Sequence, residues 1–229
     1  MDILQYDDDD APASNQGFHC GALMAAKELG LPITEKEIER AITAYQRMFK
    51  AAFGEGNISS QYLLKALAQF TGCIVSSNSK YDRVQRGEMS FTPPEQNGYN
   101  LFKSKCAGCH KEPLFTDNSF RNNGMPLNTL LNDYGRMKVT NDPNDSLKFK
   151  VPSLRNVALS LPYMHDGRFY TLGQVIDHYR NGIQTNQPNL DTLLRKRIVM
   201  SNYEKNNLIY FLFTLTDSTL IHSARFSAY

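Results

Sequence analysis

The chain has 229 residues, of which 41% are hydrophobic and 21% are charged, and its formal net charge is +2. These fractions are typical of one folded domain or two small ones and exclude a wholly disordered chain. The nearly balanced charge gives no indication of nucleic-acid binding, and no apolar run approaches the roughly 20 residues that span a bilayer.

Residues 1–21 are predicted to form an acidic, disordered arm, because Asp7 to Gln16 mixes acids with Ala, Pro, Ser and Asn and shows no period. The first ten residues lack the basic and apolar regions of a secretory signal peptide. His19 and Cys20 are adjacent but have no further metal-ligating residue nearby, so we interpret the pair as incidental.

Two amphipathic helices are predicted after a short first helix at Ala22 to Leu29, which Gly30 and Pro32 end. Thr34 to Glu37 has the pattern of a capping box and predicts a helix start there. Its expected buried face consists of Ile38, Ile42, Tyr45, Phe49 and Phe53.

The next helix is expected to be capped by Ser59 or Ser60. Its apolar stripe consists of Leu63, Leu64, Leu67, Phe70 and Ile74. We expect Cys73 in this helix to be a buried, inert thiol. Tyr81 to Gly87 is predicted to be a charged connection.

A further pair of helices is predicted from distant parts of the chain. Pro93-Pro94 suits the first turn of a helix on which Gly98 and Phe102 share one face. Because Gly98 allows close approach, its expected partner is a helix from about Tyr203 to Leu215. The partner's apolar face consists of Leu208, Phe211, Leu212 and Leu215. Between them, Glu112 to Asn144 is rich in Asn, Asp, Gly and Pro and predicts long loops.

The sequence Cys106-Ala107-Gly108-Cys109-His110 follows the first of these helices. Two thiols three positions apart can add across the two vinyl groups of one haem, and the adjacent histidine can bind its iron. With four cysteines and five histidines in the chain, random placement gives this pentapeptide with a probability on the order of one in a thousand. A zinc or redox Cys-x-x-Cys would need a second ligand pair or a βαβ context, and neither is present. One covalent haem c is therefore predicted.

Several stretches resemble a known family: Ala52 to Gly54, Ala66 to Asn78, Tyr134 to Thr140, Phe149 to Val157, Tyr163 to Phe169 and Thr171 to Tyr179. From about Tyr45 to the C-terminus, the sequence resembles the bacterial dihaem cytochrome c peroxidases and the related enzymes that mature methylamine dehydrogenase. The resemblance implies two haem domains, each with its own Cys-x-x-Cys-His, whereas this sequence has one.

The resemblance also implies the domain organisation. Residues 22–90 would be a helical remnant of the N-terminal, peroxide-binding domain, with part of its apolar surface uncovered. Residues 91–229 would be the C-terminal, electron-accepting domain. We therefore expect an all-α fold, with a cytochrome c-like haem domain that has long loops and the helical remnant beside it. Because such haem attachment takes place outside the cytoplasm, the resemblance favours a fragment of a periplasmic protein.

The sixth iron ligand has two candidates. Counted from His165-Asp166-Gly167, the position that holds methionine in the peroxidases and tyrosine in the maturation enzymes is Tyr179. Met164 is the competing candidate. A thioether ligand raises the reduction potential, whereas a phenolate oxygen stabilises ferric iron and lowers it. Three other methionines are interpreted as ordinary packing residues: Met125, Met137 and Met200.

Other residues are assigned by their place near these motifs. His165 is predicted to lie at the haem edge, and His178 to be exposed. Arg155 and Arg168 can pair with haem propionates, because a guanidinium group binds a carboxylate with two hydrogen bonds, or can form ordinary ion pairs. In the family, backbone carbonyls at positions corresponding to Ser160 and Pro162 help to hold a calcium ion. The remaining ligand would belong to the other haem domain, which argues against calcium in this chain.

Two functions follow from the resemblance. The first is a cytochrome-c peroxidase-type oxidoreductase, which reduces hydrogen peroxide with electrons from a small cytochrome or copper protein and can be a homodimer. The second is a one-electron carrier or degenerate module without peroxide turnover of its own. Peroxide chemistry needs an open iron position and an acid–base group beside it, and no residue of this sequence can be assigned to the latter role.

Overall fold

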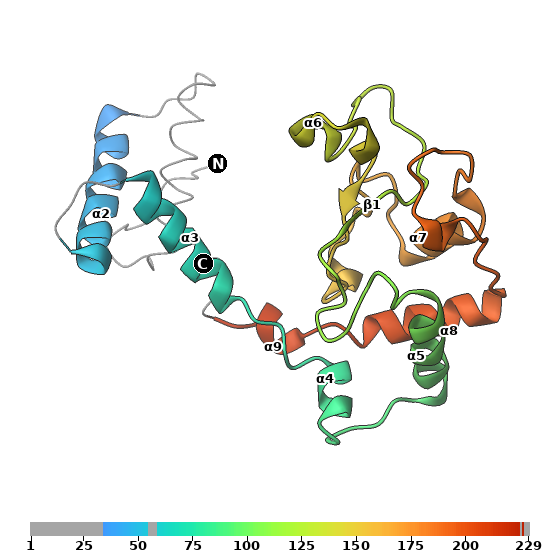
Figure 1. The fold of residues 1–229 in the computed structure, drawn as a ribbon. Coiled ribbons are helices and arrows are strands. Elements are labelled where there is room, and N and C mark those ends of the chain that lie inside the picture. Colours follow the sequence, from blue (N-terminus) through green and yellow to red (C-terminus); the bar gives the residue numbers. More distant parts are fainter. Residues whose placement is uncertain (1–33, 55–58, 225, 227–229) are drawn as a thin grey trace. The chain divides into compact units, whose positions relative to one another are not determined.

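The computed structural model describes residues 34–54, 59–224 and 226 (Figure 1). The described residues fall into two units, the first with residues 34–54 and 59–75 and the second with residues 76–224 and 226. The predicted acidic arm, the helix at Ala22 to Leu29 and the His19-Cys20 pair lie outside the described residues. No helix in the described ranges combines the length and the apolar character needed to cross a membrane.

The first unit contains helices α2 (Glu35–Phe53) and α3 (Ser60–Cys73). Helix α2 begins directly after Thr34, as the capping-box pattern predicted. Ser59 is the N-cap of α3, and its hydroxyl accepts a hydrogen bond from the Tyr62 amide at 3.3 Å. The rings of Phe53 and Tyr62 stack with their centroids 4.8 Å apart, so the aromatic face of α2 continues onto α3.

The apolar stripe of α3 is not buried by any of the described residues. All five of its members are exposed: Leu63, Leu64, Leu67, Phe70 and Ile74. Cys73 is exposed as well, so the prediction of a buried thiol was wrong. The physical reason is that two helices offer too little apolar area to bury a whole stripe.

The second unit begins with a helix in the segment that was predicted only to be a charged connection. Helix α4 (Lys80–Gln85) starts with a capping box in which Ser79 and Asp82 exchange side-chain and backbone hydrogen bonds. Tyr81 in this helix is buried. Its amide donates to the Thr214 carbonyl at 3.0 Å. The capping and the buried tyrosine together explain why this short, polar segment is helical.

Helices α5 (Pro93–Lys105) and α8 (Asn202–Phe213) make the most extensive helix–helix contact of the second unit and cross each other in Figure 1. This confirms the predicted pairing of distant segments. Gly98 is required at the crossing, because a Cβ atom there would lie 1.9 Å from the carbonyl oxygen of Asn207. The core around the crossing includes fully buried Phe102 and Phe211.

Most of the chain between α5 and α8 is irregular, as predicted for Glu112 to Asn144. A two-stranded antiparallel ladder joins β1 (Phe120–Arg121) to β2 (Phe149–Lys150). The other short elements are α6 (Met137–Thr140), η2 (Pro143–Asp145), η3 (Val157–Leu159), α7 (Leu172–Asp177), η4 (His178–Gly182), η5 (Thr192–Leu194) and, after α8, α9 (Ser218–Ile221). The expectation of a mainly helical protein is confirmed.

The expected domain boundary after residue 90 stays a prediction, as does the origin of residues 22–90 in a second haem domain. The structure does show to which unit residues 76–90 belong. Residues 76–90 belong to the compact unit that carries the Cys-x-x-Cys-His motif. Tyr81 is part of that unit's hydrophobic core together with Phe115 and Leu215.

Candidate haem-binding site

The Cys-x-x-Cys-His motif forms a turn at the end of α5. Cys106 caps the helix, and its amide donates to the Phe102 carbonyl. The amides of Cys109 and His110 both donate to the Cys106 carbonyl, at 3.2 and 3.0 Å. This turn brings the two thiols and the imidazole to one cavity. Both thiols are free and half-buried.

That cavity has a volume of about 530 Å³ and contains most of the predicted site. Six residues assigned from the sequence line it: Cys106, Cys109, His110, Met164, His165 and Tyr179. The rest of the wall is mainly apolar and includes Phe102, Val157, Leu172, Ile176, Met200, Leu208 and Leu212. A mainly apolar cavity of this size with a few convergent polar groups is typical of a small-molecule or cofactor site.

The orientation of His110 follows from its two hydrogen-bond partners. Its Nδ1 lies 3.0 Å from the Phe115 carbonyl oxygen and 3.2 Å from the Pro152 carbonyl oxygen. Because a carbonyl can only accept, Nδ1 carries the hydrogen and Nε2 keeps a free lone pair. Burial lowers the pKa of His110, with the two carbonyls acting in the opposite direction. The neutral imidazole that can bind a metal is therefore favoured.

Tyr179 lies in the π-helical turn η4, which directly follows α7. Such turns widen a helix and are frequent at functional sites. Burial raises the pKa of Tyr179 to about 12, and hydrogen bonding to Asn123 opposes this shift. Without a cation beside it, the side chain is a neutral phenol, so its role as a ligand requires the charge of a bound iron.

Met164, the alternative ligand, also lines the cavity. Its backbone is left-handed, with φ of 71°, a conformation that non-glycine residues rarely adopt. The Asn123 side-chain amide donates to the Met164 sulfur at 3.5 Å. Asn123 thus contacts both candidate ligands, and the choice between Tyr179 and Met164 stays a prediction.

Asn123 was not identified from the sequence, where Asn122-Asn123-Gly124 only indicates a turn. Its carbonyl lies 3.0 Å from Nε2 of His178. The prediction that His178 is exposed was wrong, since its side chain is buried. On a regular helix His178 would point away from Tyr179 towards solvent. The π-helical turn changes the angular spacing of side chains, so His178 does not face solvent here.

The two arginines predicted to bind propionates do not line the cavity. Arg155 forms a bidentate ion pair with Asp82, and Arg168 pairs with Asp166. Both therefore adopt the ion-pair arrangement that the sequence left as the alternative. Four other cations line the cavity and could contact an acidic group there: Lys105, Arg121, Lys150 and Arg180. Of these, Arg121 is already paired with Asp117 and Asp191, and Arg180 with Asp177.

His165 is exposed at the cavity wall, where its ring stacks on Phe149 with centroids 3.8 Å apart. Ser160 and Pro162 line the same cavity. Within the described residues, no group of three or more His, Cys, Asp or Glu side chains could hold a metal ion. The calcium site, which rested on backbone carbonyls, is not supported by any further observation.

The residues of the cavity fit a covalently attached haem. Two free thiols and an imidazole with a free Nε2 lone pair converge on one apolar space. Haem c needs two thioether attachments, an axial nitrogen and low-polarity surroundings, and this donor set supplies all of them.

Comparison with known proteins gives a family whose description also names haem. The sequence model of a family described as di-haem cytochrome c peroxidase matches residues 11–90. Methylamine utilization protein MauG of Methylorubrum extorquens is 36% identical over 182 residues, 77% of this chain and 50% of that protein. Cytochrome c551 peroxidase of Nitrosomonas europaea is 37% identical over 149 residues, 63% of this chain and 44% of that protein.

Solved structures agree in fold. The crystal structure of a MauG-like protein associated with microbial copper homeostasis has a TM-score of 0.64 and 33% identity, over 78% of this chain and 64% of that one. The diheme peroxidase BthA from Burkholderia thailandensis has a TM-score of 0.62 at 20% identity, over 81% of this chain and 59% of that one, which shows likeness of fold alone. The chain spans about half the length of the curated relatives it matches. It belongs to the family of di-haem cytochrome c peroxidases and MauG proteins, whose named peroxidases are oxidoreductases.

Proposed function

We propose that this chain is the electron-accepting, cytochrome c-like haem domain of a periplasmic peroxidase-family protein. One observation carries the proposal: the attachment motif and both candidate sixth ligands, Tyr179 and Met164, line one cavity. The iron of a haem held there could take His110 and one of these two side chains as protein ligands. Such an iron suits one-electron exchange better than binding of peroxide.

The residues around the cavity have separate tasks in this proposal. Cys106 and Cys109 hold the macrocycle by thioethers, and His110 presents Nε2 to the iron while its Nδ1 is fixed by two carbonyls. The apolar side chains exclude water. When bound, the haem supplies a reversible one-electron couple. Electrons would come from a small cytochrome or copper protein, as in the peroxidases that the family resemblance implies.

Reduction of hydrogen peroxide to two waters consumes two electrons and two protons, and it needs an open coordination site with an acid–base group beside it. No carboxylate is among the described residues that line the cavity. With Tyr179 or Met164 on the iron, the open site is lacking as well. The chain on its own should therefore exchange electrons but turn over peroxide very slowly.

A steady-state assay with a reduced donor cytochrome and hydrogen peroxide tests this. We expect rapid reduction of the haem by the donor, which is itself oxidised, and no peroxide turnover above the rate of free haem. Turnover in the usual enzyme range of roughly 1–10³ per second would contradict it and show that the haem is open to peroxide. That result would favour the other candidate function, a complete peroxidase.

A further inference from the structure

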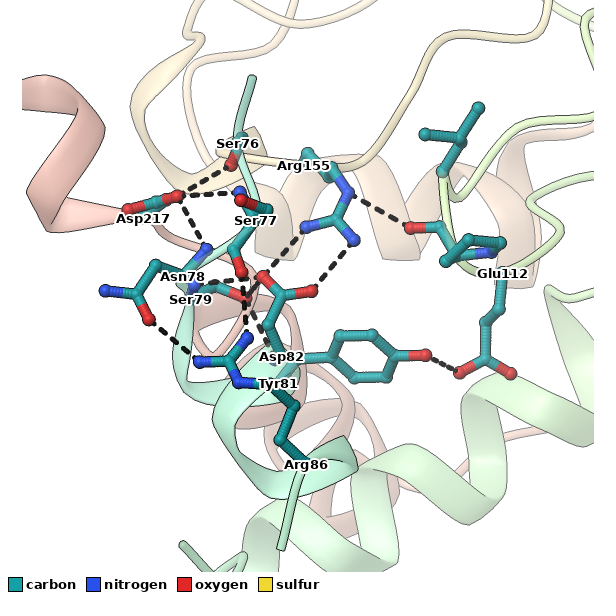
Figure 2. Close-up of polar contacts among 12 residues, drawn as sticks. Ser76, Ser77, Asn78, Ser79, Tyr81, Asp82, Arg86, Glu112, Arg155 and Asp217 are labelled. Atoms are coloured by element: carbon teal, nitrogen blue, oxygen red, sulfur yellow. Dashed lines mark hydrogen bonds and ion pairs between the residues drawn. The ribbon is translucent and has the colours of Figure 1, made fainter. Parts of the chain in front are cut away.

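We call the second unit the haem-binding unit, and its first segment, residues 76–86, is held by polar contacts (Figure 2). The Asp217 carboxylate, which is 1% exposed, accepts hydrogen bonds from the amides of Ser77 and Asn78, both at 2.9 Å. Arg86 then donates to the Ser77 carbonyl at 3.0 Å. These contacts fix the start of α4, and therefore the position of Asp82.

Asp82 forms a bidentate ion pair with Arg155, whose position in the chain is 73 residues away. The two nitrogen–oxygen distances are 3.0 and 2.9 Å, and the side chains are 12% and 11% exposed. Burial acts to raise the pKa of Asp82, but hydrogen bonds from Arg155 and Ser79 outweigh it and hold the pKa below its usual value. The pair is thus charged and directional, which favours a fixed geometry.

Arg155 also reaches the loop that follows the haem motif. Its Nε donates to the Pro113 carbonyl at 3.0 Å. The same two stretches are joined again where the Ser153 hydroxyl donates to the Leu114 carbonyl at 2.6 Å. The loop after the motif and the stretch around residues 152–155 are therefore held together by Arg155 and Ser153.

These two stretches supply the carbonyls that bind the imidazole of the motif. Phe115, two residues after Pro113, and Pro152, three residues before Arg155, both accept the hydrogen on Nδ1 of His110. The distance from Nδ1 to each carbonyl thus depends on how the two stretches lie. Asp82 is therefore linked to His110 through Arg155, the Pro113 carbonyl and the short backbone stretches that carry the carbonyls of Phe115 and Pro152.

Helix α4 has a second contact with the same loop. The Tyr81 hydroxyl donates to the Glu112 carboxylate at 2.5 Å, next to the residue whose carbonyl binds Arg155 (Figure 2). The ring of Tyr81 also packs edge-on against Phe115, with centroids 4.8 Å apart. Helix α4 therefore holds the loop in two ways: through the ion pair of Asp82 with Arg155, and through the hydroxyl and ring of Tyr81.

We propose that Asp82, through Arg155, is a positioning residue that sets the hydrogen bonding of His110 and thereby the reduction potential of the haem. The proposal rests on the proposed haem attachment. A shorter Nδ1–H to carbonyl bond makes the imidazole a stronger donor to iron, which stabilises the ferric state and lowers the potential. When the pair is disturbed, the loop relaxes and the potential rises.

The test is a spectroelectrochemical titration of the full chain after haem attachment. Asp82→Asn removes the charge, whereas Asp82→Glu keeps the charge but changes its reach. Positioning predicts a more positive midpoint potential in both. The ratio of oxidised to reduced haem at a fixed applied potential should fall about threefold to tenfold, where tenfold corresponds to about 59 mV for one electron.

A simple charge effect gives a different pattern. It would shift Asp82→Asn, leave Asp82→Glu at the wild-type potential, and be cancelled in the double variant Asp82→Asn with Arg155→Gln. Positioning predicts a shift in all three. Asp145→Asn is the matched control, because it removes a partly buried carboxylate from another arginine pair, with Arg136, at a site that does not line the cavity. Its potential should equal that of the wild type.

These measurements distinguish a failure of the positioning role of Asp82 from a failure of the proposed haem attachment. If Asp82→Asn fails to acquire haem, Asp82→Glu still gives the answer. Wild-type potentials in haem-loaded Asp82→Glu and in the double variant would overturn the positioning role and leave the haem site intact. A wild-type protein that acquires no haem would instead overturn the proposed function.

Discussion

Replacing Gly98 with alanine should separate the two helices that close the haem-binding unit. The new Cβ would lie 1.9 Å from the Asn207 oxygen and 2.8 Å from Cβ of Phe211, whereas ordinary contact begins at 3.4 Å. The obstacle is the backbone of α8, so no side chain can rotate away. Helices α5 and α8 must move apart by about 1.5 Å, the difference between 3.4 and 1.9 Å.

The energetic cost of this movement can be estimated. Overpacking a close-packed core typically costs about 1–3 kcal/mol, and a rigid backbone neighbour favours the upper end. The higher helix propensity of alanine offsets up to about 1 kcal/mol of this cost. The net loss in the free energy of unfolding is about 2 kcal/mol, which lowers the Tm of a chain of this size by about 4–8 °C.

Thermal unfolding followed by far-UV circular dichroism, and by haem absorbance for the haem-binding unit alone, measures this loss. Gly173→Ala is the matched control in the same unit, since its Cβ would meet only Lys205 and Thr171 side chains at 3.4 Å or more. It should leave the Tm unchanged or slightly raised. A Gly98→Ala protein with a wild-type Tm would refute the close crossing of α5 and α8.

Three further predictions concern the site and its supports. Tyr179→Phe should shift the ferric absorption spectrum towards high spin while Met164→Leu leaves it unchanged, and the opposite pattern would assign the ligand to Met164. Met200→Ala should lower the free energy of unfolding by about 2–5 kcal/mol in chemical denaturation, because Met200 is buried in the core beside the cavity, and a loss below 1 kcal/mol would contradict that packing. Burial acts to raise the pKa of Asp217, but hydrogen bonds from Thr219 and backbone amides hold it at about 2. Its carboxylate therefore stabilises the fold above about pH 4, and this stability is lost as the pH falls towards 2. The difference in free energy of unfolding between the wild type and Asp217→Asn should shrink over that interval. A difference that stays constant with pH would contradict this.

Long periodic segments could be predicted from the sequence, because their burial pattern repeats. The α5–α8 pair followed from Gly98, Phe102 and the stripe on α8, and the structure brings them together as expected. Helix α4 was missed, since six residues are too few to show a period. The Ser79 to Asp82 capping box was a local signal that could have revealed it.

The burial of single side chains was harder to predict, because it depends on contacts that the chain makes elsewhere. Cys73 lies in a helix with a periodic apolar stripe, yet no described neighbour covers it and it is exposed. His178 was misplaced because the π-helical turn changes the helical period. Periodicity gives the face of a helix but does not say what covers that face.

The site residues likewise divide into those that a sequence motif reveals and those that only the fold brings together. Cys106, Cys109 and His110 are recognisable because the chemistry requires them at fixed spacing along the chain. Asn123, Asp82 and the carbonyls of Phe115 and Pro152 act through contacts across distant segments, and two of those contacts come from backbone atoms that any residue can supply. No motif marks such groups.

The central claim is that Cys106 and Cys109 hold one haem and His110 binds its iron. The most direct measurement is the intact mass of the chain after expression in a periplasm with haem-attachment enzymes, alongside the variant with Cys106→Ala and Cys109→Ala. The account predicts that the wild type gains the mass of one haem that survives acid–organic extraction and that the variant gains none. A wild-type chain of unmodified mass, while a control cytochrome in the same cells is fully loaded, would contradict it.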